Sequence, residues 1–209
     1  MYLDKPAFPI NFSLEQAVAE IESMVKGKYW HDFEVGDLKL VYIPYWIFSY
    51  DSFKEAPAEK QESRIVSETS SGKMAFNART YELDENVSYL YESAEGEFQN
   101  QPTAEYPFEV KRPKLSSENL AGRIISVRLA AQLELPKENI IISGLELVYV
   151  PVWFAWVTVA EGTFHLQINA YSGDVISREE VPERERGWLE LTAETLEELK
   201  QPGAWVEYT

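Results

Sequence analysis

The chain has 209 residues, with 35 Asp and Glu against 19 Lys and Arg, and its formal net charge is −16. This charge repels phosphate backbones and anionic lipid at long range, so it disfavours nucleic acid as a partner. The absence of cysteine excludes disulfides, thiolate metal sites and thiol nucleophiles. Hydrophobic residues make up 45% of the chain, which is typical of a folded protein rather than a disordered one.

The first predicted element is a helix over residues 13–26. Ser13 and Gln16 have the spacing of a capping box, and apolar residues follow at helical intervals up to Val25. Strands are predicted at 37–50, 62–69 and 73–80, with a Ser-Gly turn before the last of them.

An internal repeat organises the rest of the chain. The segment Leu38–Phe48, LKLVYIPYWIF, matches Leu145–Ala155, LELVYVPVWFA, without a gap and at a spacing of 107 residues. Lys5-Pro6 and Arg112-Pro113 stand at the same spacing, whereas 68–74 matches 169–175 at a spacing of 101. The sequence therefore predicts a duplication.

The second copy predicts the same elements in the same order. A helix is expected over 116–133, with a buried stripe of Leu120, Ile124, Val127 and Ala131, and strands at 140–159, 163–170 and 174–180. The expected fold is α+β, with two tandem helix-plus-antiparallel-meander (α-β-β-β) repeats at 1–80 and 106–180. An acidic connector, 81–105, and an acidic tail, 181–209, complete the chain.

The matching strands are apolar on both faces, so we expect both faces to be covered. Tyr42, Trp46, Tyr149 and Trp153 lie on one face and form the candidate ligand or partner surface. One explanation is that the repeats, or two chains in a homo-oligomer, pack their sheets together. The other is a groove for a peptide or an apolar ligand. The recurring Pro44 and Pro151 indicate edge positions or bulges.

A helix followed by a meander, with Asn169-Ala170-Tyr171-Ser172-Gly173-Asp174 in its last hairpin, resembles the PepSY-type repeat. A tandem of such repeats with the Pro-x-Trp strand is also similar to the extracytoplasmic part of YycH/YycI-type regulators of sensor kinases. These resemblances imply a non-catalytic, protein-binding role outside the membrane, with no catalytic residues to transfer.

The search for catalytic motifs gives little. The two histidines, His31 and His165, stand far apart in the chain without a cysteine, and the S-x-x-K match at Ser70–Lys73 falls in a predicted turn. We therefore expect no enzyme activity, no cofactor and no metal. The rival hypothesis is a small apolar-ligand carrier, or a hydrolase, that uses the aromatic strand faces as its pocket.

Most of the negative charge lies outside the repeats. Segment 81–105 has seven acids and no Lys or Arg, and 179–209 has nine acids against three basic residues, so thirteen of the sixteen net charges lie in these two segments. The tail also predicts an amphipathic helix over Ala193–Lys200. We expect another protein as partner, with a basic surface if it is charged, and no direct membrane insertion, because no apolar run reaches the roughly 18 residues of a membrane helix.

Overall fold

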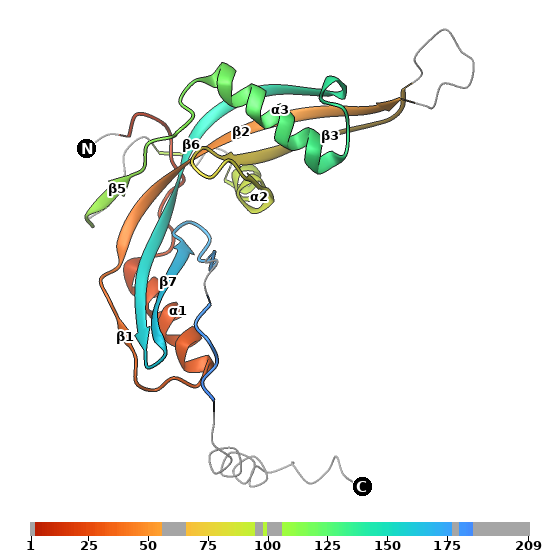
Figure 1. Cartoon of the computed structure of the whole chain (residues 1–209). Helices are drawn as coiled ribbons and strands as arrows, with labels where there is room; N and C mark the ends of the chain where they lie inside the picture. The colour runs from red at the N-terminus through yellow and green to blue at the C-terminus, as the bar shows by residue number, and fades with distance from the viewer. Residues whose placement is uncertain (1–2, 56–65, 95–97, 100–105, 177–179, 186–209) are drawn as a thin grey trace, which may run out of the picture.

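The computed structural model describes residues 3–55, 66–94, 98–99, 106–176 and 180–185 (Figure 1). This part of the chain forms an α+β fold of three α-helices and a curled, mostly antiparallel sheet of seven strands, which confirms the predicted class. The helices are α1 (Leu14–Gly27), α2 (Glu85–Ser93) and α3 (Glu118–Leu133). The strands are β1 (Glu34–Val35), β2 (Lys39–Glu55), β3 (Val66–Asn77), β4 (Leu83–Asp84), β5 (Phe108–Val110), β6 (Ile140–Val159) and β7 (Gly162–Asn169).

Two long strands, β2 and β6, form the spine of the sheet (Figure 1). They pair antiparallel from Lys39 opposite Phe154 to Ser52 opposite Ile140. The end of β2 pairs with β3, and the start of β2 pairs with β5 in parallel. The end of β6 pairs with β7 and β1. The spine therefore has a different set of neighbours at each end.

The register of the spine pairs the two matching segments with each other. Ile43 lies opposite Val150, which is its own counterpart at the 107-residue spacing. On either side of this pair, Leu40 lies opposite Trp153 and Trp46 lies opposite Leu147. Leu40 and Leu147 are counterparts at the 107-residue spacing, and so are Trp46 and Trp153. Each pair therefore joins the leucine of one segment to the tryptophan of the other. A local two-fold axis through Ile43 and Val150 therefore relates the two ends of the spine.

The recurring prolines lie where each long strand exchanges one outer neighbour for another. In β2, pairing with β5 ends at Tyr42 and pairing with β3 begins at Tyr45, so Pro44 lies between them. A proline has no N–H to donate, so it fits this local edge, where the ladder is interrupted. Pro44 accepts a hydrogen bond from the Ala78 N–H at 3.0 Å, and Pro151 accepts one from the Ala170 N–H at 2.9 Å.

Helix α1 covers one end of the spine. Its predicted capping box is present, with the Ser13 hydroxyl accepting from the Gln16 N–H and the Gln16 side chain accepting from the Ser13 N–H. The buried face of α1 packs on the start of β2 and on the end of the β6–β7 hairpin, which belongs to the other matching segment. We call this end the α1 half. Its buried core includes Ala17, Ile21, Val25, Leu40, Tyr42, Trp153, Val157, Leu166 and Ile168.

Helix α3 covers the other end, which we call the α3 half. It packs on the start of β6 and on the β2–β3 hairpin, so each helix covers the hairpin of the other matching segment. The predicted stripe of α3 is wrong at Leu120 and Val127, which are 47% and 58% exposed, and at the exposed Ala131, whereas Ile124 packs against the core. The buried stripe is Ala121, Ile125 and Leu129. Both stripes have helical spacing, so periodicity alone does not choose between them.

Helix α2 lies against the opposite face of the sheet, which we call the α2 face. Val87 and Ala94 pack there with alternate residues of the spine, including Ile47 and Val148. The spine is therefore buried on both faces over much of its length, as its apolar pattern predicts. The predicted connector, 81–105, contributes both β4 and α2.

The predicted turn at Ser70–Lys73 is wrong, because these residues lie inside the continuous strand β3. Gly72 lies opposite Tyr50, and a Cβ at Gly72 would come within 3.0–3.1 Å of that ring. Gly72 therefore allows close packing of a neighbouring aromatic side chain rather than a turn. Within the described residues, the two strands predicted at 62–69 and 73–80 are thus one continuous strand, Val66–Asn77.

The sequence match pairs the turn at Asn169–Asp174 with residues 68–74, but in the structure the equivalent turn of the first copy begins at Asn77. Asn77 Oδ1 accepts from the N–H groups of Arg79 and Thr80, at 2.9 and 3.1 Å. In the same way, Asn169 Oδ1 accepts from the N–H groups of Tyr171 and Ser172, at 2.9 and 3.3 Å. After the second turn only a bridge between Ile168 and Val175 is described, where a strand over 174–180 is predicted. The helix predicted over 193–200 lies outside the described residues.

Candidate functional site

The four aromatic residues that the sequence selects as a ligand or partner surface are buried. Tyr42, Trp46, Tyr149 and Trp153 are 1%, 5%, 2% and 1% exposed. They lie under α1 and α3, so they do not line an accessible groove in the described structure. The sequence shows that these rings share a face but not that a helix covers it. A candidate site has to be sought among other residues.

The two tryptophans anchor helices. Trp46 Nε1 donates to the carbonyl of Leu115 at 3.0 Å, two residues before the N-cap Ser117 of α3. Trp153 Nε1 donates to the carbonyl of Phe12 at 2.8 Å, next to the N-cap Ser13 of α1. A buried indole N–H needs such a partner. The repeated Pro-x-Trp pattern therefore serves to hold the helix that precedes the other long strand.

An aromatic patch lies exposed on the α2 face of the α1 half. It consists of Phe154 and Trp156 from β6 and His165 from β7, and Trp156 is 55% exposed. Trp156 and His165 are direct cross-strand partners with ring centroids 4.5 Å apart, and His165 lies 5.0 Å from the Phe154 ring. Cross-strand packing therefore holds His165 against both rings.

The corresponding positions in the α3 half are buried or carry small side chains. The 107-residue spacing relates Phe154 to Ile47 and Trp156 to Ser49. Ile47 is only 3% exposed, because the α2 cluster packs over it. The aromatic patch is thus the part of the α2 face that lies beyond the reach of α2. An exposed tryptophan within a row of aromatic rings is a typical sign of an interaction surface.

A depression of about 840 Å³ adjoins the aromatic patch; we call it the aromatic depression. It crosses the sheet from the Asn77 turn to β7. Its lining residues are Ile43, Tyr45, Asn77, Arg79, Thr80, Glu82, Leu83, Asp84, Lys111, Phe154, His165, Gln167 and Ile176. The Tyr45 hydroxyl donates to Asp84 Oδ2 at 3.3 Å. Burial, with a further contribution from the Asp84 charge, holds the pKa of the Tyr45 phenol well above its usual range, so Tyr45 stays a neutral donor.

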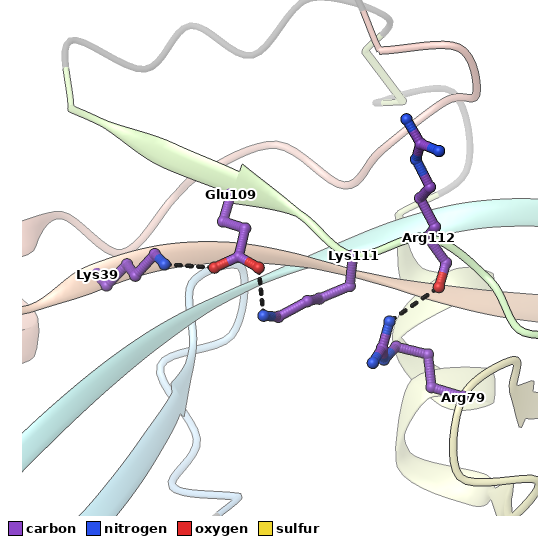
Figure 2. Close-up of polar contacts among 5 residues, drawn as sticks. All are labelled: Lys39, Arg79, Glu109, Lys111 and Arg112. Carbon is purple, nitrogen blue, oxygen red and sulfur yellow. Dashed lines mark hydrogen bonds and ion pairs between the residues drawn. The ribbon is translucent and has the colours of Figure 1, made fainter.

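A group of basic side chains lies at one edge of the aromatic depression (Figure 2). The basic cluster consists of Lys39, Arg79 and Lys111; Arg79 and Lys111 belong to the lining, and the Arg112 side chain points away from them (Figure 2). Figure 2 shows Glu109 between Lys39 and Lys111, ion-paired to both. Hydrogen bonds first from Lys111 and then from Lys39 lower the pKa of Glu109 to about 2. Arg79 Nη1 donates to the Arg112 carbonyl at 2.9 Å.

The sequence contained one signal for this site that our prediction did not use. Strand β7 alternates apolar residues with Thr163, His165 and Gln167, which is the pattern of a strand with one wet face. The neighbouring spine strand β6 is apolar from Leu147 to Val157, and this hides the difference between its covered and uncovered parts. Lys39 and Arg79 join Lys111 from distant parts of the chain, so the sequence gives no sign that these cations meet.

The aromatic depression combines an apolar wall, hydrogen-bonding groups and a charged edge. Among the described residues, no three His, Asp or Glu side chains gather as metal ligands. Ser70–Lys73 lies within a strand and His31 is exposed, so neither contributes to the site.

Comparison of the chain with family models, with curated proteins and with solved structures gave no match. None of the helices in the described ranges is long and apolar enough to cross a membrane.

Proposed function

We propose that the chain is a non-enzymatic protein-binding or regulatory module built from two PepSY-like repeats. The support for two repeats is the paired set of contacts described above: the spine centred on Ile43 and Val150, the two indole anchors and the two Asn-Ala turns. The resemblance to YycH/YycI-type regulators adds an extracytoplasmic location to this proposal.

One observation carries the binding function: the α2 face is covered by a helix in the α3 half and presents an exposed aromatic patch in the α1 half. Helix α2 shows what this face accepts. It presents Val87, Leu90 and Tyr91 to the sheet and keeps Glu85 and Glu92 in solvent. The proposed ligand is therefore an amphipathic segment of a partner protein, laid across the aromatic patch with its apolar side inward.

The charged groups at the edge of the site are balanced. Lys39, Arg79 and Lys111 supply three cations at one edge of the aromatic depression, while Glu109 is paired to two of them and Glu82 and Asp84 are acids of the lining. Charged groups at the rim make the rate of association with a charged partner sensitive to salt.

The test substitutes Trp156→Ser, which copies Ser49 from the α3 half, in the full chain. Ile141→Ser is the matched control, because Ile141 is 57% exposed on the same strand but lies in the other half. Partners retained by the unaltered chain are identified, purified and titrated by calorimetry. We expect Trp156→Ser to weaken binding by about tenfold or more, as for an aromatic hot spot, and Ile141→Ser to leave it unchanged. Equal affinities for the unaltered chain and the Trp156→Ser variant overturn the proposal.

The second candidate function is a carrier of a small apolar ligand. It is favoured by the volume of the aromatic depression, about 840 Å³, because ligand sites commonly measure about 300–1,000 Å³. A saturable change in Trp fluorescence with an apolar ligand, lost in His165→Ala, supports this function. A second copy of the chain at the aromatic patch would instead appear as a concentration-dependent dimer.

A further inference from the structure

Helices α1 and α3 bury equivalent faces. Their N-caps, Ser13 and Ser117, lie 104 residues apart in the sequence. At the same spacing, each of three buried apolar residues of α1 has a buried apolar counterpart in α3: Ala17 matches Ala121, Ile21 matches Ile125 and Val25 matches Leu129. The outer faces of the two helices can therefore be compared residue by residue.

These outer faces differ. On α3, Leu120 and Val127 are exposed apolar residues. Their counterparts on α1 are Gln16 and Ser23, which are polar and exposed. Helix α1 thus covers its half of the sheet with polar side chains at these two positions, so the core does not require apolar ones there.

A groove of about 620 Å³ lies along the outer face of α3; we call it the α3 groove. It is lined by residues of α3 and of the 3₁₀ turn Lys137–Asn139 that follows the helix. Leu120, Ile124 and Val127 form its apolar row. Leu120 and Val127 lie two helical turns apart, which is about 10 Å along the axis. A contiguous apolar row that is open to solvent is typical of an interaction surface.

The cations of the α3 groove are unpaired in the part of the chain that the structure describes. Arg123, Arg128 and Lys137 line the groove, are exposed and take part in none of the described ion pairs. Glu138 is the one acid among the described lining residues. At the basic cluster, by contrast, Glu109 is paired to two of the cations. The α3 groove is therefore a locally positive surface on a chain whose net charge is −16.

We propose that the α3 groove binds an acidic amphipathic helix of a second protein. The apolar side of that helix lies on the apolar row, and its flanking carboxylates pair with the three cations. Charges beyond about 8 Å, the Debye length in physiological salt, are largely screened, so the distant acids of the chain do not prevent this association. The inference goes beyond the proposed function, because α3 covers the face of the sheet opposite the α2 face. One chain can therefore hold two partners at separate sites.

The probe is a synthetic helical peptide of Leu, Ala and Glu, with Leu along one face and Glu on both flanks. It carries a fluorescent label, and its anisotropy is followed as the full chain is added. One comparison peptide has Lys in place of Glu, and another has the same composition in shuffled order. We expect the acidic amphipathic peptide to bind at least about tenfold more tightly than either, because only it offers both an apolar face and flanking carboxylates.

Substitutions in the α3 groove locate the binding. The double variant Leu120→Gln, Val127→Ser gives α3 the outer residues of α1 and should weaken binding of the acidic peptide by about tenfold or more. Arg123→Gln combined with Arg128→Gln should weaken it by about the same factor and reduce its salt dependence. Ile141→Ser removes an exposed apolar residue outside the groove and should leave binding unchanged. Thermal unfolding followed by circular dichroism shows whether each variant folds, and Val127→Ser alone replaces a double variant that does not.

The outcomes separate this inference from the proposed function. No binding of the acidic peptide, equal binding of the three peptides, or equal affinity for the unaltered chain and the groove variants overturns the inference. Loss of peptide binding in Trp156→Ser places the peptide at the aromatic patch, which overturns the inference and supports the proposed function. Peptide binding that depends on the α3 groove, with no partner that depends on Trp156, supports the inference and overturns the proposed function.

Two other occupants are tested with the same variants. Co-sedimentation with phosphatidylglycerol vesicles tests an anionic membrane, and sedimentation velocity over a range of concentrations tests a second copy of the chain. We expect neither association to depend on Leu120 and Val127, because the acidic chain repels both anionic lipid and its own copies at long range. Vesicle binding or self-association that is lost in the double variant assigns the α3 groove to that occupant and overturns the inference.

Discussion

The α1 half and the α3 half hold their helices in the same way but differ on the opposite face of the sheet. Each has a tryptophan that anchors a helix and an Asn-Ala turn that ends a hairpin. Only the α3 half has a described helix on its α2 face. The shared features are those that make the core, and the difference lies where one half exposes aromatic side chains. We therefore expect the features that the halves share to determine the stability of the protein, and the features in which they differ to determine its binding.

The largest effect is expected at the indole anchors. Trp46→Ala and Trp153→Ala should each lower the free energy of unfolding by about 3–5 kcal/mol, because each leaves a cavity and removes a buried hydrogen bond. Trp156→Ala, in the same strand as Trp153 but 55% exposed, should cost less than about 1 kcal/mol. Urea unfolding measures all three. A large cost in one half and a small cost in the other would show that the two anchors are not equivalent.

The next effect concerns the two buried tyrosines at high pH. Burial raises the pKa of Tyr42 and of Tyr149 to about 12, from an ordinary value of 10.0. Below pH 10 both states keep the phenol proton. Above it the unfolded chain loses the proton first, so the free energy of unfolding falls until the folded rings titrate near pH 12. The loss approaches about 2–3 kcal/mol per ring.

Tyr42→Phe and Tyr149→Phe test this prediction in urea unfolding series between pH 9 and 12. Each substitution should flatten the alkaline loss by a similar amount. Tyr149→Phe should also cost about 1 kcal/mol at neutral pH, because the Tyr149 hydroxyl donates to Asp4 Oδ1 at 3.1 Å. An unchanged alkaline slope in either variant would contradict the raised pKa assigned to that tyrosine.

A smaller effect is expected at the Asn169 turn. Gly173 has φ +83°, and an added Cβ would lie 2.9 Å from the Phe12 ring. Gly144 has φ +64° with nothing within 4 Å, so it isolates the backbone strain. We expect Gly144→Ala to cost about 1 kcal/mol and Gly173→Ala about 2 kcal/mol, measured by urea unfolding. Tyr81 occupies the place in the Asn77 turn that Gly173 occupies in the Asn169 turn, and it has φ 65°. A side chain is therefore tolerated at this place where no ring like that of Phe12 lies against it. Equal losses of unfolding free energy for the two glycine substitutions would show that contact with the Phe12 ring does not contribute.

Local sequence signals predicted much of the fold. The capping box at Ser13 placed α1, and the apolar-rich segment from Ile140 to Val159 placed β6 with its observed bounds. Gly72 was misread, because a glycine needed for contact with Tyr50 on another strand looks the same as a turn glycine. The Asn77 turn was missed for the opposite reason, since it reaches its positive φ at Tyr81 and has no glycine to mark it.

The candidate site could not be predicted in the same way, because it depends on which parts of one apolar strand are covered. Ile47 and Phe154 look alike in sequence, and only the position of α2 makes the first buried and the second partly exposed. Lys39, Arg79 and Lys111 come together through the parallel pairing of β5 with β2 and through the Asn77 turn. Such long-range pairings leave no periodic signal in the sequence.

The smallest effect is expected at Glu109 of β5, which is ion-paired beside β2. The segment Pro6–Phe8 runs beside β6 as β5 runs beside β2, but the described structure has no ion pair of this kind there. Glu109→Gln should lower the free energy of unfolding by less than about 1 kcal/mol at neutral pH, because the three side chains are partly exposed. The pKa of Glu109 is lowered to about 2, so its contribution is present above pH 4.5 and is lost as the pH falls toward 2. Unfolding series at low and high salt, from pH 2 to 7, measure this. A cost that persists in high salt would show that Glu109 acts by packing. In the binding assay, the same substitution leaves Lys39 and Lys111 unneutralised, so a partner segment with acidic side chains near them should bind more tightly and with a steeper salt dependence.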